Sequence, residues 1–278
     1  MRKRYVCWAG VVLLGLLLPA GYAAMARGSL GIDGLIGPTL GAMSGAVRAP
    51  NPAPAGKGDR ASLDTDPHLV GWWKLDDVSG KIAADSSKHG HNGTLMDGLS
   101  FEKDSVPGRI GKALQLGGRG GYIEITGYKG VTGTRPRTLA AWVKTASPGG
   151  EIMSWGVDEP GKMWTFRIVG TGIYVDPKGG YLYTNTKVHD DVWHHVAAVV
   201  EEADPPTLQK VKLYKDGELE KLHDIGLLDL YPIDTGSGVD VRIGRGFKGL
   251  MDDVRVYDRA LSPEEIRNLA TVSGGKSD

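Results

Sequence analysis

Aspartates collect at two places in this sequence where their carboxylates could bind a metal ion. Asp76, Asp77 and Asp85 follow the first strand-like segment, and Asp252 and Asp253 lie in the last one. Carboxylates combined with backbone carbonyls suit Ca²⁺, which takes about 6–8 oxygen ligands. The sequence holds no compact calcium-binding loop. A second interpretation therefore stays open, in which these aspartates form turns by accepting hydrogen bonds from nearby backbone N–H groups.

Aromatic side chains are the second set that could bind a ligand, because Trp and Tyr rings stack on the faces of sugars. The alternation of residues 69–75 directs Trp73 towards the core and Trp72 towards the opposite face. The candidate ligand-binding residues are Trp72, Trp155, Trp164, Tyr181 and Tyr183. The alternative for each is an ordinary aromatic of the core or of a sheet edge.

Several classes of function are disfavoured by the sequence. Ser154 is not preceded by the glycine of a Gly-x-Ser-x-Gly elbow, and no His-Glu-x-x-His zinc helix occurs. His194 and His195 are adjacent in a strand, so their side chains point to opposite faces and cannot share one metal. The single cysteine, Cys7, lies in the N-terminal segment. The balance of 33 basic and 33 acidic side chains argues against a nucleic-acid binder. We therefore predict no catalytic residues.

The first 26 residues have the pattern of an export signal. Basic residues at positions 2–4 precede an uncharged stretch, which is densest in Val and Leu at residues 11–18. Residues 24–26 supply a small-x-small cleavage site, so we expect cleavage near Arg27 and a secreted, periplasmic or cell-surface location. The uncharged stretch is also long enough to span about 30 Å of hydrocarbon, so an uncleaved membrane anchor is the alternative.

The remaining chain divides into a linker and one domain. Residues 27–67 are rich in Gly and Pro and predict a flexible linker. From residue 68 to 272, short alternating runs recur between Gly, Asp, Asn and Pro, which predicts an all-β, two-sheet antiparallel jelly-roll sandwich. Ser262 and Glu265 form a capping-box pattern for one short C-terminal helix. Residues 273–278 are a C-terminal tail.

Two glycine-bearing segments, residues 117–121 and 215–218, predict hairpin turns between flanking strands. Residues 192–200 are apolar in both alternating phases. This pattern predicts a central strand whose two faces are both covered.

Six motifs in order resemble a LamG-like jelly-roll domain. They are residues 71–77 (GWWKLDD), 108–116 (GRIGKALQL), 139–143 (LAAWV), 193–197 (WHHVA), 213–217 (LYKDG) and 249–262 (GLMDDVRVYDRALS). The resemblance implies the fold of the concanavalin A-like lectin and glucanase superfamily, with two curved antiparallel sheets. Laminarinase-type glucanases of that superfamily carry a Glu-x-Asp-x-x-Glu strand, which this sequence lacks. We therefore expect no glycosidase activity.

The resemblance also implies a structural calcium ion, which this superfamily often holds on its convex side. The aspartate before the closing strand of the family is similar to Asp252, which becomes the first candidate ligand, followed by Asp76 and Asp85. We expect an exported, non-catalytic module that binds carbohydrate or a cell-surface partner. The alternatives are a structural or adhesion spacer without glycan affinity, and a glycan-active hydrolase or lyase with an unrecognised site.

Overall fold

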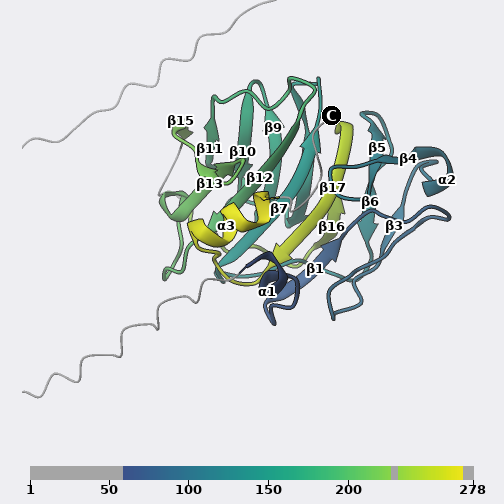
Figure 1. Cartoon of the computed structure of the whole chain (residues 1–278). Coiled ribbons are helices and arrows are strands. Elements are labelled where there is room, and N and C mark those ends of the chain that lie inside the picture. The colour runs from purple at the N-terminus through teal and green to yellow at the C-terminus, as the bar shows by residue number, and fades with distance from the viewer. Residues whose placement is uncertain (1–58, 227–230, 272–278) are drawn as a thin grey trace, which may run out of the picture. The chain divides into compact units, whose positions relative to one another are not determined.

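The computed structural model describes residues 59–226 and 231–271, which form a sandwich of two antiparallel sheets (Figure 1). The all-β jelly-roll class predicted from the sequence, with its short C-terminal helix, is therefore confirmed. The predicted signal peptide at residues 1–26, residues 27–58 of the predicted linker and the tail at 273–278 lie outside the described residues.

One sheet has eight strands in the described part of the chain. Its spatial order is β14 (Glu218–Leu219), β13 (Val211–Lys215), β12 (Trp193–Val200), β7 (Arg137–Lys144), β17 (Lys248–Tyr257), β5 (Lys112–Gly117) and β4 (Ser105–Pro107), with β1 (Leu69–Trp73) also paired to β17. β12 lies between β7 and β13, so the prediction of a central strand there is confirmed.

The other sheet has nine strands within the same described residues. Its order is β15 (Leu222–Gly226), β11 (Tyr181–Thr184), β10 (Gly172–Asp176), β9 (Met163–Val169), β8 (Gly149–Gly156), β16 (Val239–Ile243), β6 (Ile123–Ile125), β3 (Gly93–Leu95) and β2 (Ile82–Ala83).

Short helices complete the described structure: α1 (Arg60–Asp64), α2 (Phe101–Asp104), the 3₁₀ helix η1 (Leu208–Lys210) and α3 (Pro263–Ala270). The predicted capping box is present at the start of α3, where the Ser262 side chain accepts a hydrogen bond from the Glu265 N–H and the Glu265 carboxylate accepts one from the Ser262 N–H. Within residues 59–226 and 231–271, no helix combines the length and apolarity needed to cross a bilayer.

The space between the sheets is filled by side chains at alternate strand positions. In β9, Trp164, Phe166 and Ile168 point inward and are fully buried, whereas Thr165 and Arg167 between them reach the outer surface. Each buried apolar side chain of this size contributes about 1.5–3 kcal/mol to folding through removal of its surface from water. In β9 the intervening positions are therefore free for other roles.

The two predicted hairpins have different outcomes. Residues 215–218 do form a two-residue turn between β13 and β14, with Asp216 and Gly217 at positive φ. The hairpin prediction for residues 117–121 is wrong, because β5 belongs to the eight-stranded sheet and β6 to the nine-stranded one. This glycine-rich segment instead carries the chain from one sheet to the other.

The outer face of the eight-stranded sheet is partly covered by α1 and α3 (Figure 1). Leu63 of α1 and Ile266 of α3 pack with Trp72 and Tyr257 in a second apolar cluster outside the main core. The linker prediction for residues 27–67 is therefore wrong at its C-terminal end, since residues 60–64 are a helix packed on the domain.

β17 changes partner halfway along its length. Its first half pairs with β5 and its last four residues pair with β1, while β7 runs along the other side. The register shifts between Asp252 and Arg255, and Asp253 has a φ of 50°. Asp252 and Asp253 therefore lie at the irregular point of β17 between its pairing with β5 and its pairing with β1.

Candidate functional site

Three tyrosines cluster on the outer face of the nine-stranded sheet. The ring centroids of Tyr174 and Tyr181 are 5.6 Å apart with the rings inclined by 16°, and Tyr183 lies 6.2 Å from Tyr174. His223 on β15 meets Tyr183 edge-on at 5.2 Å. We name Arg167, Tyr174, Tyr181, Tyr183 and His223 the tyrosine face. All three tyrosines are partly exposed, so their rings are accessible to a ligand.

Strand alternation explains how these tyrosines reach the surface. Ile173 and Val175 of β10 are fully buried, which directs Tyr174 between them to the outer side. Tyr181 is opposite Gly226 in the strand register. A Cβ atom at Gly226 would come within 2.5 Å of the Tyr181 ring, so glycine at this position lets the ring lie over the neighbouring strand.

The positively charged side chain of Arg167 lies next to the tyrosines. The guanidinium carbon of Arg167 lies 4.6 Å from the ring centroid of Tyr174, within the range of a cation–π contact. The strand register continues this row across four strands through Glu151, Arg167, Tyr174 and Tyr183. Burial and the nearby Asp176 raise the pKa of Tyr174, and Arg167 partly opposes this rise.

Two glutamates of this sheet, one of them in that row, are already paired with arginines. Glu151 accepts from Arg245 at 2.6 Å and from the Ser154 hydroxyl at 2.7 Å, and this contact raises the pKa of Arg245. Glu124 accepts from Arg242 at 3.2 Å. Both carboxylates therefore serve in ion pairs that brace the sheet face.

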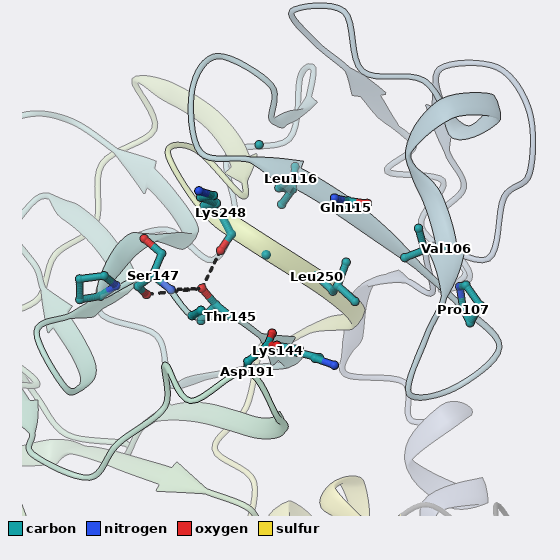
Figure 2. A pocket seen from close by; sticks show the side chains of 14 residues that line it. Val106, Pro107, Gln115, Leu116, Lys144, Thr145, Ser147, Asp191, Lys248 and Leu250 are labelled. Carbon is teal, nitrogen blue, oxygen red and sulfur yellow. Dashed lines mark hydrogen bonds between the residues drawn. The ribbon is translucent and has the colours of Figure 1, made fainter. Parts of the chain in front are cut away.

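A concave feature lies on the eight-stranded sheet, next to β4, β5, β7 and β17 (Figure 2). Its volume is about 740 Å³, and its lining includes Gln115, Lys144, Asp191, Lys248 and Leu250. We name this cavity the lysine pocket. It lies on a different sheet from the tyrosine face, so the two surfaces are separate.

Trp155 and Trp164 do not occupy a binding surface. Both are 0% exposed, and their rings meet at 6.2 Å inside the core between the sheets. The prediction that they bind ligand is wrong, because each takes an inward position of its strand where a sugar has no access. The alternative interpretation, a core aromatic, applies to both.

Trp72 lies on the outer side of β1 as the alternation predicted, but it is covered. Its indole N–H donates to Asp253 at 2.5 Å, and its ring is held between Arg255 at 4.1 Å and Lys74 at 4.3 Å. Only 8% of its surface is exposed. The prediction of a surface stacking residue is therefore wrong for Trp72, because α1 and the neighbouring charged side chains cover this face.

The charges around Trp72 form a buried network. Asp253 pairs with Arg255 at 3.1 Å and with Arg60 of α1 at 2.6 Å, and Arg255 also pairs with Asp64 at 2.6 Å. Burial alone would raise the pKa of Asp253, but Arg255 and Arg60 bring it below its ordinary value. The network ties α1 to the closing strand.

The three aspartates proposed as calcium ligands are in different surroundings. Asp85 accepts four hydrogen bonds, from the backbone N–H groups of Trp72, Ser87 and His91 and from the Ser87 hydroxyl, at 2.7–2.9 Å. Its carboxylate is therefore used in a turn, as the alternative interpretation predicted. Asp76 and Asp252 line a common small cavity from which Asp85 is absent.

Asp252 is the one of the three whose surroundings fit a cation. Its side chain is fully buried, Oδ2 accepts from the Ile110 N–H at 2.8 Å, and Oδ1 has no hydrogen-bond partner. Burial raises the pKa of Asp252 to about 8, and Asp253 and Asp76 add to the effect. No cluster of three or more His, Cys, Asp or Glu side chains gathers in the described residues, so a bound calcium ion here would need backbone carbonyls as further ligands.

The sequence analysis did not name Arg167, Tyr174 and His223 of the tyrosine face, nor the lining of the lysine pocket. Tyr174 has a readable signal, because it alternates with Ile173 and Val175 in the same way that Tyr181 and Tyr183 flank Leu182. The lysine pocket has no such signal, since it joins Gln115, Lys144 and Lys248 from three strands whose order in the sheet the sequence does not reveal.

Two packed antiparallel sheets define this domain as a jelly-roll β-sandwich. A family model described as the concanavalin A-like lectin/glucanases superfamily matches residues 116–267. The chain therefore belongs to this superfamily, as its motifs predicted. A search of curated proteins finds no match.

Solved structures share the fold. Domain 4 of AbnA, a GH43 extracellular arabinanase from Geobacillus stearothermophilus in complex with arabinotriose, is similar with a TM-score of 0.54 and 22% identity, over 73% of this chain and 98% of that one. The binding domain of Paraclostridial Mosquitocidal Protein 1 is similar with a TM-score of 0.51 and 15% identity, over 73% of this chain and 52% of that one. At these identities the likeness establishes the fold.

Proposed function

We propose that this chain is an exported, non-catalytic carbohydrate-binding module that holds a glycan on its tyrosine face. The observation that carries the proposal is the clustering of three partly exposed tyrosine rings, 5.6–6.3 Å apart, on an open sheet face. Aromatic rings present a flat apolar surface to the C–H groups of a sugar ring and carry a hydroxyl for its polar edge.

Polar side chains beside the rings can orient a bound sugar. Arg167 sits over Tyr174, and its Nε atom is buried without a hydrogen-bond partner. His223 is exposed at the edge of Tyr183. The Arg167 guanidinium places a positive charge beside the Tyr174 ring, where it can orient the polar groups of a bound sugar.

The carboxylates on this sheet are paired with arginines, which supports sugar binding rather than sugar hydrolysis. A retaining glycosidase needs two carboxyl groups about 5–5.5 Å apart, one of which is protonated and acts as general acid. Glu151 and Glu124 are instead held by Arg245 and Arg242. Both carboxylates are thus engaged by guanidinium groups and are not free to act on a sugar.

The similar domain from Geobacillus stearothermophilus also supports the proposal of carbohydrate binding. It is a domain of an arabinanase, and its structure contains arabinotriose. A glycan partner is therefore the first class to test for this chain, and a cell-surface protein partner is the second. We further propose export through residues 1–26 and a structural calcium ion held by Asp252 with help from Asp76, both on the sequence and chemical grounds given above.

A glycan array tests the proposal directly. We expect the wild-type domain to bind at least one class of oligosaccharide and Tyr174→Ala and Tyr183→Ala each to lose at least about tenfold in affinity, equivalent to about 1.4 kcal/mol. Leu219→Ala is the matched control, because it truncates an exposed side chain on the other sheet. Unchanged binding in both tyrosine variants would remove the tyrosine face, and a blank array with a positive partner pull-down would favour the adhesion alternative.

A further inference from the structure

The lysine pocket is a concave surface that the proposed function does not use. It opens on the eight-stranded sheet, away from the half of that sheet covered by α1 and α3. Its volume of about 740 Å³ lies within the range of about 300–1,000 Å³ that is typical of small-ligand sites. The pocket is therefore large enough for a ligand of its own.

The wall of the pocket is held in place by Thr145, which is 1% exposed. Its hydroxyl donates to the Lys248 carbonyl at 2.6 Å and accepts from the Ser147 N–H at 2.9 Å (Figure 2). The Thr145 carbonyl accepts from the Asp191 N–H at 2.9 Å. These bonds join the β7–β8 loop, β17 and the loop before β12, so the cavity is formed before any ligand arrives.

The floor of the pocket is a row of side chains on neighbouring strands. Leu250 is opposite Gln115 of β5 on one side and Lys144 of β7 on the other, and Figure 2 shows Leu250 between them. Gly249 allows the close approach of β17 to β7, because a Cβ atom there would lie 2.3 Å from the Lys144 carbonyl oxygen. The row places an apolar side chain between an amide and an amine.

Charge distinguishes this pocket from an ordinary surface hollow. Lys144 and Lys248 both line it, and within the described residues neither ammonium group makes a hydrogen bond or an ion pair. Asp191 is the one carboxylate among the lining residues. The lining thus carries an excess positive charge and two ammonium donors that lack acceptors.

We propose that the lysine pocket binds an oligosaccharide that carries carboxylate groups, a uronate oligomer. Lys144 and Lys248 pair with its carboxylates, Gln115 bonds to its hydroxyls, and Leu250 packs against an apolar sugar face. The backbone groups of the floor are used in the pairing of β5, β17 and β7, so an extended acidic peptide cannot add to them as a further strand. This inference is independent of the tyrosine face.

Isothermal titration of the folded protein with oligomers of galacturonate, glucuronate and mannuronate tests the proposal. We expect binding of at least one of them and a loss of at least about tenfold for the same oligomer after methyl esterification, which removes its charge. Lys144→Gln and Lys248→Gln together should reduce affinity by at least about tenfold, whereas Lys81→Gln, on an exposed side chain by β2, should not. Equal thermal midpoints establish that the variants remain folded.

Two further measurements separate the alternatives. Tyr174→Ala should leave uronate binding unchanged, and a loss there would assign the acidic sugar to the tyrosine face and overturn the proposal. Poly-glutamate should bind at least tenfold more weakly than the best uronate. The proposal also fails if no uronate binds at about 1 mM, if the methyl ester binds equally well, if poly-glutamate matches the uronate, or if the double lysine variant binds as the wild type does.

Discussion

Leu63→Ala should destabilise the domain markedly, although the sequence places this residue in a linker. Leu63 is 1% exposed and packs with Trp72 and Ile266 on the outer face of the eight-stranded sheet. The helix that carries it is also fixed by Arg60, which pairs with the buried Asp253 at 2.6 Å. Leu63 is thus part of the second apolar cluster of the domain, whereas a residue of a flexible linker would be solvated.

The magnitude follows from the burial of Leu63. Truncation of a buried leucine to alanine costs about 2–5 kcal/mol, because apolar contact is lost and a cavity remains. We expect about 3 kcal/mol here, since one side of the site is a short helix that can adjust. For a domain of this size, 1 kcal/mol corresponds to roughly 2–4 °C, so the thermal midpoint should fall by roughly 6–12 °C.

Urea unfolding followed by tryptophan fluorescence measures this loss. Ile82→Ala is the control, because it removes an apolar side chain that is 51% exposed and should change stability by less than about 0.5 kcal/mol. The urea dependence of the unfolding free energy should stay the same in both variants. A change below about 0.5 kcal/mol for Leu63→Ala would refute the packing of α1 on the domain.

Two further predictions concern pH and calcium. His194 bonds to Asp216 at 2.8 Å and Asp190 at 3.0 Å, which raises its pKa despite burial and the nearby Lys215. The stabilisation from protonated His194 is therefore complete below about pH 6.5 and is lost as pH rises through the raised pKa. In urea unfolding, the loss of unfolding free energy caused by His194→Gln should therefore shrink from about pH 6 to pH 9. A loss that grows over this range would contradict the prediction. Calcium in excess should raise the thermal midpoint by several degrees over chelator in the wild type and not in Asp252→Asn, and identical wild-type midpoints would remove the calcium proposal.

Much of the fold could be predicted because strand alternation and turn residues are local signals. The capping box of α3 and the 215–218 turn were readable for this reason. The 117–121 hairpin was not, because the same glycines serve a turn within a sheet and a crossing between sheets. Which partner each strand takes is decided by long-range packing that local sequence does not encode.

The binding residues were predicted less well, for a physical reason. Alternation tells which face of a strand a residue takes, but it does not tell whether that face is covered. Trp72 was assigned to the correct side of β1, yet α1 and a buried ion network cover that side. Tyr181 and Tyr183 were named as candidates without an assigned face, and both are partly exposed in the structure.

The tyrosine face can be observed most directly by solution NMR with labelled tyrosine rings, during titration with the oligosaccharide that binds best in the array. The account predicts that the ring resonances of Tyr174, Tyr181 and Tyr183 shift together along one saturating curve, while the ring resonances of the buried Tyr257 stay in place. Saturable binding that leaves all three tyrosines unshifted would contradict the proposed site.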